Sequence, residues 1–245
     1  MYQERIIGVV VPAYNEEYLV EATIQDIPDL VDRIYIVDDA SVDNTAQVIG
    51  RFNGSRCCPI FHPTNRGVGA AIVTGYKKAI EENIDIVVVM AGDNQMDPRE
   101  LPRLLTPLTE GKADYTKGNR LSKLEHRHGM SNWRYFGNQT LSILTRIASG
   151  YWRIGDPQNG YTAITYEALR RIDLDALYPR YGYCNDMLIK LKVAGCRVVD
   201  IPMASRYGEE KSKIRYGNYV STVSPLLLRG FLWRVRANVT TQEHI

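Results

Sequence analysis

The sequence contains no apolar run long enough to cross a bilayer. A transmembrane helix needs about 18 to 20 predominantly apolar residues, and the hydrophobic residues of this chain are spread over shorter runs. The first residues, Met1-Tyr2-Gln3-Glu4-Arg5, lack the features of a signal peptide. We therefore expect a cytoplasmic protein, soluble or peripheral to the membrane. The alternative is a piece of a longer protein that carries further transmembrane helices.

Cysteine is also scarce, and net charge is small. Cys57, Cys58, Cys184 and Cys196 have neither metal-ligand spacing nor the density of a disulfide framework. We expect them to be reduced thiols, as in most cytosolic proteins. The net charge of +2 is not that of a polycation, so we expect no nucleic-acid partner.

Short β-branched runs alternate with amphipathic segments along the chain, without repeats. Nearly continuous apolar strands in such an alternation predict an α/β fold, in which helices cover both faces of a mostly parallel sheet. Strands are predicted at Ile6–Val11, Arg33–Asp38, Cys57–Phe61, Ile84–Ala91 and Arg197–Ile201, with an edge strand at Asp114–Gly118. Helices are predicted at Glu16–Ile27, Asp43–Ile49, Val68–Glu82, Pro98–Leu108, Asn132–Ser149 and Gly182–Ala194.

Polar residues follow three of the predicted strands. They are Tyr14-Asn15-Glu16-Glu17, Asp38-Asp39-Ala40-Ser41 and Gly92-Asp93-Asn94-Gln95. Because parallel sheets bind ligands at the carboxyl ends of their strands, these clusters indicate one binding rim. The glycine-rich turn of a dinucleotide-binding fold is missing after the first strand. The glycine-rich, basic loop of sugar nucleotidyltransferases is missing there too.

The motifs at 9–17, 36–45, 65–71 and 92–98 together resemble family 2 glycosyltransferases. The resemblance implies the glycosyltransferase A-type (nucleotide-diphospho-sugar transferase) fold, with a mostly parallel central sheet flanked by helices. The second half resembles the branch that glycosylates dolichyl or other polyprenyl phosphates. That likeness rests on Lys117–Arg120, Asp156–Tyr161, Gly182–Asp186 and Arg206–Lys213.

The resemblance assigns the donor site. Contacts to the nucleotide base and ribose come from Pro12, Tyr14, Glu16 and Asp39, and carboxylates suit this task because they accept hydrogen bonds from hydroxyl and N–H groups. The sugar pocket is assigned to Gln158 and Asn159, and catalysis and donor binding both involve Asp93.

A divalent metal is expected beside the donor diphosphate. The resemblance assigns Mg²⁺ or Mn²⁺ to Asp93 and Gln95, and such hard ions prefer oxygen ligands. Ala91 replaces the first aspartate of the family's Asp-x-Asp motif. This departure leaves open a weaker metal site, a ligand from Asp97, a metal held mainly by the diphosphate, or a protein that binds its donor without turnover.

The acceptor residues also follow from the resemblance. A lipid phosphate is assigned to Arg120, Arg134 and Arg206, with Lys213 nearby. Asp186 occupies the position of the catalytic carboxylate in many family members. It would be a general base toward a hydroxyl acceptor, whereas toward an ionised phosphate it would only orient the reactants.

We expect residues 1–205 to form the catalytic domain and 206–245 a basic, amphipathic segment. Lys211–Arg236 holds six Lys or Arg and no acidic residue, beside an apolar strip with Trp233. Such a strip suits an anionic membrane surface, although a helix docked on its own domain is an alternative. The predicted function is inverting transfer from a UDP- or GDP-sugar to a polyprenyl phosphate at the cytosolic membrane face. The alternatives are a sugar-hydroxyl acceptor and a nucleotide-sugar-binding protein with impaired catalysis.

Overall fold

The computed structural model describes residues 1–54, 56–122, 132–204 and 216–242, without the side chains of 132–138, 216–221 and 238–242. The strands are β1 (Ile7–Ala13), β2 (Arg33–Asp38), β3 (Cys57–Phe61), β4 (Ile86–Val89), β5 (Tyr115–Asn119), β6 (Thr162–Thr165) and β7 (Val198–Pro202). The helices are α1 (Val20–Asp26), α2 (Thr45–Gly50), α3 (Val68–Glu81), the short 3₁₀ helix η1 (Pro98–Glu100), α4 (Leu101–Thr109), α5 (Asn132–Ser149), α6 (Tyr166–Arg171), α7 (Tyr183–Val193) and α8 (Tyr216–Gln242).

The strands form one seven-stranded sheet in the order β3-β2-β1-β4-β6-β5-β7. Only β6 runs antiparallel to its neighbours, β4 and β5, and the other neighbouring strands pair in parallel. The predicted mostly parallel sheet is therefore confirmed. The prediction of an edge strand at Asp114–Gly118 is wrong, because β7 pairs with the outer side of β5 and takes the edge.

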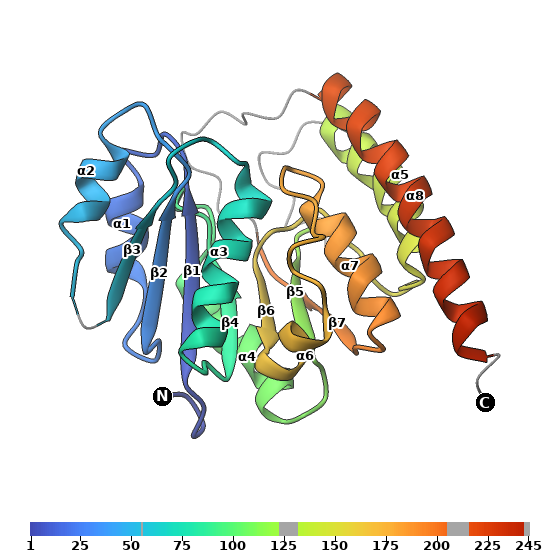
Figure 1. Cartoon of the computed structure of the whole chain (residues 1–245), viewed down its shortest axis with the longest axis horizontal. Helices are drawn as coiled ribbons and strands as arrows, with labels where there is room; N and C mark the ends of the chain where they lie inside the picture. Colours follow the sequence, from blue (N-terminus) through green and yellow to red (C-terminus); the bar gives the residue numbers. More distant parts are fainter. Residues whose placement is uncertain (55, 123–131, 205–215, 243–245) are drawn as a thin grey trace.

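Helices cover both faces of the sheet (Figure 1). Side chains alternate along β1: Ile7, Val9 and Val11 pack with α1, α2 and α4, whereas Val10 packs with α3 and α7. Successive side chains of a strand point to opposite faces, so two separate apolar cores form. All seven residues of β1 are buried, as expected for a strand in the middle of a parallel sheet.

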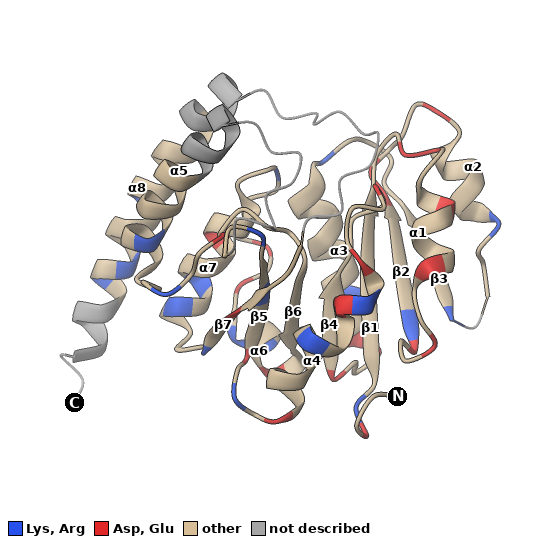
Figure 2. Ribbon diagram, turned by 180° about the vertical axis from the view of Figure 1, so that it is seen from behind, with Lys and Arg blue, Asp and Glu red and all other residues tan. Residues whose placement is uncertain are grey.

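A further layer lies beside α7, where α5 and α8 run side by side (Figure 1). Leu141 and Ala148 of α5, Ile189 of α7, and Val223 and Leu227 of α8 form a third apolar cluster. Three arginines, Arg229, Arg234 and Arg236, and no acidic residues lie on α8 (Figure 2). Within the described part of the chain, no helix is long and apolar enough to cross a membrane.

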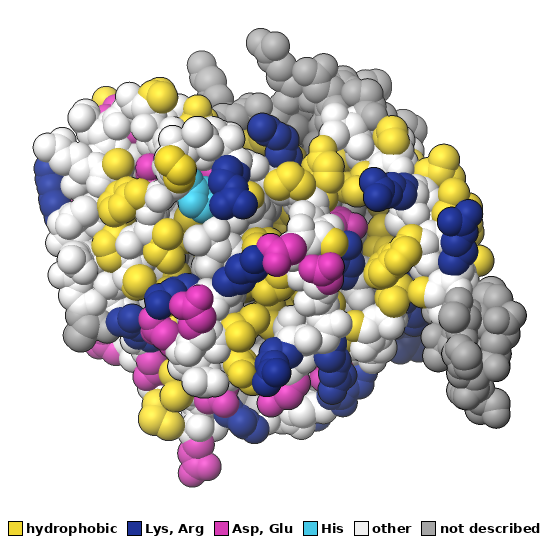
Figure 3. All heavy atoms as spheres, viewed as in Figure 1, with side chains coloured by type: hydrophobic (Ala, Val, Ile, Leu, Met, Phe, Trp, Pro, Cys, Tyr) yellow, Lys and Arg dark blue, Asp and Glu magenta, His cyan; other side chains and the backbone are white. Residues whose placement is uncertain are grey.

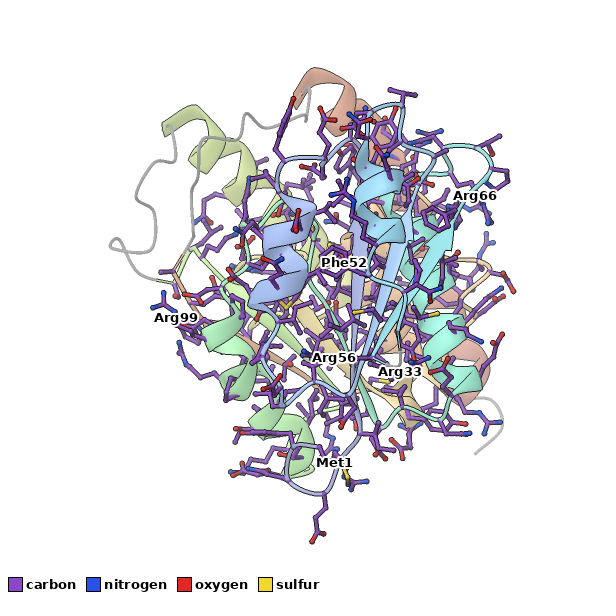
Figure 4. All side chains as sticks on the ribbon, turned by 90° about the vertical axis from the view of Figure 1, so that its left-hand side faces the viewer. Met1, Arg33, Phe52, Arg56, Arg66 and Arg99 are labelled. Carbon is purple, nitrogen blue, oxygen red and sulfur yellow. The ribbon has the colours of Figure 1, made fainter. Side chains whose placement is uncertain are left out.

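The segments after β1 and β2 hold one another by hydrogen bonds. The main-chain N–H groups of Asn15 and Glu16 donate to the hydroxyls of Ser41 and Thr45, at 2.9 and 2.8 Å. The helix was expected to begin at Glu16, but the main-chain N–H groups there are hydrogen-bonded to the segment after β2. Helix α1 begins only at Val20. The rim therefore keeps its loop form at the carboxyl ends of the strands. Arg66 lies toward this end of the molecule, and Met1, before β1, lies toward the other (Figure 4).

Candidate functional site

A cavity of about 310 Å³ lies at the carboxyl ends of β1, β2 and β4. Five of the residues predicted for the donor line it: Pro12, Tyr14, Glu16, Asp39 and Asp93. Tyr14 is 39% exposed, so its ring is accessible to a planar ligand. The structure thus brings together residues from three separate strand ends. We refer to this cavity as the donor cleft.

Asp39 lies almost fully buried in the wall of the donor cleft. Its Oδ1 accepts hydrogen bonds from the main-chain N–H of Arg66 at 2.9 Å, and its Oδ2 from that of Gly67 at 2.7 Å. His62, which sequence reasoning missed, places Nδ1 2.7 Å from Asp39 Oδ1. Asp39 therefore fixes the turn that leads into α3.

Gly67 and Gly69 let this turn approach the loop before α7. Gly67 has φ +97°, and a Cβ there would lie 2.5 Å from the Pro179 carbonyl oxygen. A Cβ on Gly69 would lie 2.4 Å from that of Tyr178. Only glycine allows both close contacts. They place the loop before α7 along the donor cleft.

Arg180 and Tyr181 of that loop line the donor cleft, and sequence reasoning missed both. They follow no strand and lie far along the chain from the rim motifs, so no local pattern identifies them. Arg180 offers a cation on a wall that otherwise carries Glu16, Asp39 and Asp93. A guanidinium is well suited to a diphosphate.

The metal candidates lie after β4. Asp93 lines the donor cleft, and its Oδ1 accepts a hydrogen bond from the Gln95 main chain at 3.1 Å. Ala91 lines the cleft as well, whereas Gln95 is not one of its lining residues among those described. The carboxylate of Asp97, the alternative ligand, pairs with the Arg99 guanidinium at 2.7 Å. Among the described residues, no three His, Cys, Asp or Glu side chains form a metal cage.

Asp186 lines a second cavity of about 650 Å³ between α7, α8 and the loop before α7. Its Oδ2 accepts a hydrogen bond from the Tyr178 main chain at 2.9 Å and lies 3.5 Å from Lys190 Nζ. Burial raises the pKa of the Asp186 carboxyl, and Lys190 opposes that rise. Asp186 thus anchors the loop that carries Arg180 and Tyr181. Its catalytic role stays a prediction.

Arg120 and the predicted sugar-pocket segment lie beside β5. The Arg120 guanidinium pairs with the fully buried carboxylate of Asp156 at 2.7 Å. Asn159 is buried, and its main-chain oxygen accepts a hydrogen bond from the buried ammonium of Lys117. Gln158 accepts a hydrogen bond from Ser142 at 3.4 Å. Gln158 and Asn159 are not among the described residues that line the donor cleft, and their contact with the sugar stays a prediction.

The remaining acceptor residues cannot be placed. Arg206 and Lys213 lie outside the described residues, as does the boundary expected between 205 and 206. Arg134 belongs to the first turn of α5, but its side chain lies outside the description. Their contact with an acceptor phosphate therefore stays a prediction.

Two relatives match most of this chain. The UDP-N-acetylglucosamine–dolichyl-phosphate N-acetylglucosaminyltransferase of Methanococcus voltae is 29% identical over 221 residues, which cover 84% of this chain and 88% of the relative. The undecaprenyl-phosphate mannosyltransferase of Micrococcus luteus is 31% identical over 206 residues, covering 79% and 81%.

A solved structure and a family model agree with these relatives. Glucosyl-3-phosphoglycerate synthase from Mycobacterium tuberculosis, in complex with Mn²⁺, UDP-glucose and phosphoglyceric acid, has a TM-score of 0.68 at 22% identity, over 94% of this chain and 80% of that one. This likeness confirms the predicted glycosyltransferase A-type fold. The model of glycosyl transferase family 2 matches residues 8–173. The chain therefore belongs to glycosyltransferase family 2 and is a nucleotide-sugar-dependent glycosyltransferase, as the strand-end motifs predicted.

Proposed function

We propose that this chain transfers a sugar, with inversion, from a UDP- or GDP-sugar to a polyprenyl phosphate. The observation that carries the proposal is an apolar and basic surface on the two helices beside α7. It exposes Ile143, Leu144 and Ile147 of α5 and Leu228, Leu232 and Trp233 of α8. The relatives from Methanococcus voltae and Micrococcus luteus support it, since both are named for transfer to a polyprenyl phosphate.

The surface suits an acceptor whose tail stays in a bilayer. Apolar and basic side chains lie next to each other over this part of the molecule (Figure 3). Arg229 and Arg236 are exposed on α8, beside its exposed leucines. Such a combination binds reversibly to anionic membranes. We therefore propose that the protein works as a peripheral enzyme at the cytosolic face.

The donor cleft fits a divalent ion together with a diphosphate. Mg²⁺ is usually held by one or two carboxylates plus substrate phosphates, rather than by a cage of protein ligands. Of the carboxylates that line the cleft, Asp93 is the one that follows β4, and Arg180 lines the cleft as well. We propose that Asp93 holds Mg²⁺ or Mn²⁺, with Gln95 positioning the Asp93 carboxylate through its main-chain N–H. The bound ion would neutralise charge on the leaving diphosphate.

The transfer itself exchanges one bond for another. An acceptor phosphate oxygen attacks the anomeric carbon from the side opposite the diphosphate, a new C–O bond forms, and the nucleoside diphosphate leaves with the electron pair. The nucleophile is already ionised, so no general base is required. This agrees with the place of Asp186, which supports the loop at the donor cleft rather than lining it.

Two rival functions make different demands. A sugar-hydroxyl acceptor would have to lose a proton, which would make Asp186 an obligate base. A donor-binding protein without turnover would be explained by Ala91, which stands where the family has an aspartate.

The test is incubation with a panel of UDP- and GDP-sugars, Mn²⁺ and a polyprenyl phosphate, with products identified by mass spectrometry. The expected product is the polyprenyl phosphate carrying one added sugar. The matched control acceptor is the same polyprenol without phosphate, which should remain unmodified. Transfer to a saccharide instead of the lipid would favour the first rival, and donor binding without any product the second.

A further inference from the structure

Both ring nitrogens of His62 lie within hydrogen-bond distance of a partner, and one partner, Asp39, lines the donor cleft. His62 follows β3 and is almost fully buried. Nδ1 lies 2.7 Å from Asp39 Oδ1, and Nε2 lies 2.9 Å from the hydroxyl of Thr74 on α3. The cleft wall therefore contains a chain of contacts from α3 through His62 to Asp39.

The protons of this chain can be assigned. An ionised carboxylate only accepts hydrogen bonds, so His62 must carry its proton on Nδ1 and donate it to Asp39. The Thr74 hydroxyl can give its single proton either to His62 Nε2 or to the Ala70 carbonyl oxygen, which lies 3.1 Å away. The first arrangement suits a neutral imidazole and the second an imidazolium. His62 donates to Asp39 in both.

The donations from His62 and from the Arg66 main chain together fill one oxygen of Asp39. A carboxylate has about four lone-pair positions, two on each oxygen. Oδ1 accepts from His62 and from the Arg66 main chain, while Oδ2 accepts only from the Gly67 main chain. One position on Oδ2 therefore remains, and Asp39 lines the donor cleft.

The number of open acceptor positions on Asp39 decides how many N–H groups of a nucleotide base the carboxylate can accept. Guanine presents two adjacent donors, N1–H and the exocyclic amine, which pair with a carboxylate through both of its oxygens. Uracil presents a single N–H between two carbonyl groups. A site that cannot satisfy one donor of a base leaves that donor unpaired, and this costs affinity.

We propose that His62 is a specificity-determining residue: by occupying Oδ1 of Asp39, it restricts the base to one N–H and makes the cleft select UDP-sugars over GDP-sugars. The inference rests on the proposed function, because it takes a nucleotide sugar as the ligand of this cleft. It goes further by naming the base and the residue that selects it. His62 acts through Asp39 and need not touch the donor.

The experiment measures the dissociation constants of UDP and GDP by calorimetry, with Mn²⁺ present. The wild-type protein should bind UDP at least about tenfold more tightly than GDP, the size of discrimination that one unpaired polar group gives. Tighter or equal binding of GDP would overturn the inference while leaving glycosyl transfer to a polyprenyl phosphate intact. Binding of neither nucleotide would overturn both.

Variants separate selection from simple support of the fold. His62→Phe opens one acceptor position on Oδ1, while the Arg66 main chain keeps the other. The UDP-to-GDP preference should therefore shrink by about tenfold, whereas a merely structural role would weaken both nucleotides equally. His62→Gln retains an N–H donor and should keep part of the preference. Thr74→Val is the matched control, because it removes the partner of Nε2 but leaves Nδ1–H on Asp39. An unchanged ratio in a folded His62→Phe protein, or a lost ratio in Thr74→Val, would refute the role of His62.

Discussion

Arg120 and Asp156 form a two-point ion pair. Arg120 Nε donates to Asp156 Oδ2 at 2.7 Å, and Nη2 donates to Oδ1 at 3.2 Å. Burial alone would raise the pKa of the Asp156 carboxyl, but the charge and hydrogen bonds of Arg120 bring it below its usual range. An acceptor phosphate would therefore have to use the other N–H groups of the Arg120 guanidinium. The pair fixes the orientation in which those groups are presented.

Removing Arg120 should destabilise the fold as well as impair acceptor binding. Arg120→Ala leaves a buried carboxylate unpaired, which costs about 3 to 5 kcal/mol of unfolding free energy. Asp156→Asn in the same chain removes the charge and should restore part of that loss. Urea denaturation of the two single variants and the double variant measures the coupling. If the double variant is no more stable than Arg120→Ala, the pair does not stabilise the fold.

Asp200 on β7 should make stability depend on pH. Its Oδ2 accepts hydrogen bonds from Asn119 and from the Gly155 main chain, but its buried Oδ1 has no hydrogen-bond partner among the described residues. Burial raises the pKa of the Asp200 carboxyl to about 6, against the opposing charge of Lys117. The folded state thus holds its proton more tightly than the unfolded chain. Stability is lost as pH rises through that range.

Asp200→Asn removes this loss. Relative to the wild type, the variant should gain up to about 3 kcal/mol of unfolding free energy between about pH 4 and about pH 8, since one pKa unit corresponds to about 1.4 kcal/mol. Urea denaturation at the two pH values measures the gain. A constant difference between the proteins would mean that Asp200 titrates as it does in an unfolded chain.

Local patterns in the sequence predicted most of the helices and strands, but they missed one strand and the place of another in the sheet. Arg33–Asp38 and Cys57–Phe61 became β2 and β3 with the predicted bounds, because short apolar runs are a local signal. The four-residue β6 was too short to be detected. The interior place of β5 depends on pairing with β7, which comes much later in the chain. Such long-range pairing leaves no mark in the local pattern.

The same limit applies to the candidate site. Tyr14, Glu16, Asp39 and Asp93 follow strands and line the donor cleft, because the carboxyl ends of parallel strands share one edge. Gln95 also follows a strand but does not line the cleft among the described residues, and the roles of all these residues stay predictions. Arg180 and Tyr181 reach the cleft through a loop that approaches α3 at Gly67. His62 contacts Asp39 of the cleft wall, and only the fold brings it against Asp39 and Thr74. Sequence motifs carry no signal for tertiary contacts of this kind.

Donor binding should depend on metal through Asp93. Asp93 lines the donor cleft, whereas the carboxylate of Asp97 is engaged by Arg99. With Mn²⁺ present, Asp93→Ala should weaken nucleotide-sugar binding about tenfold or more in calorimetry, equivalent to at least about 1.4 kcal/mol. Asp97→Asn is the matched control and should change binding little. Equal affinities of the wild type and Asp93→Ala, with and without Mn²⁺, would refute the metal assignment.

The final prediction concerns attachment to membranes. α8 packs on the domain through Val223 and Leu227, while Leu228 and Leu232 on its other side are 62% and 48% exposed. Deleting the helix would expose the packed side, so point substitutions give the cleaner test. The double substitution Leu228→Ser/Leu232→Ser removes apolar area only from the exposed side. Trp233 is left in place because Lys190 Nζ lies 5.3 Å from its ring centroid.

Wild-type protein should sediment with anionic liposomes at low salt and be released as salt screens the charges. Leu228→Ser/Leu232→Ser should weaken that binding without changing the affinity for nucleotide. Replacing Arg229 and Arg236 by Gln should weaken it about 30-fold, because each basic side chain near an anionic surface contributes about 1 kcal/mol. Val42→Ser alters an exposed apolar residue between β2 and α2 and is the matched control. If wild type and both α8 variants sediment alike, α8 is not the membrane contact. If the wild type ignores anionic liposomes at low salt, this chain does not reach its lipid through a peripheral surface.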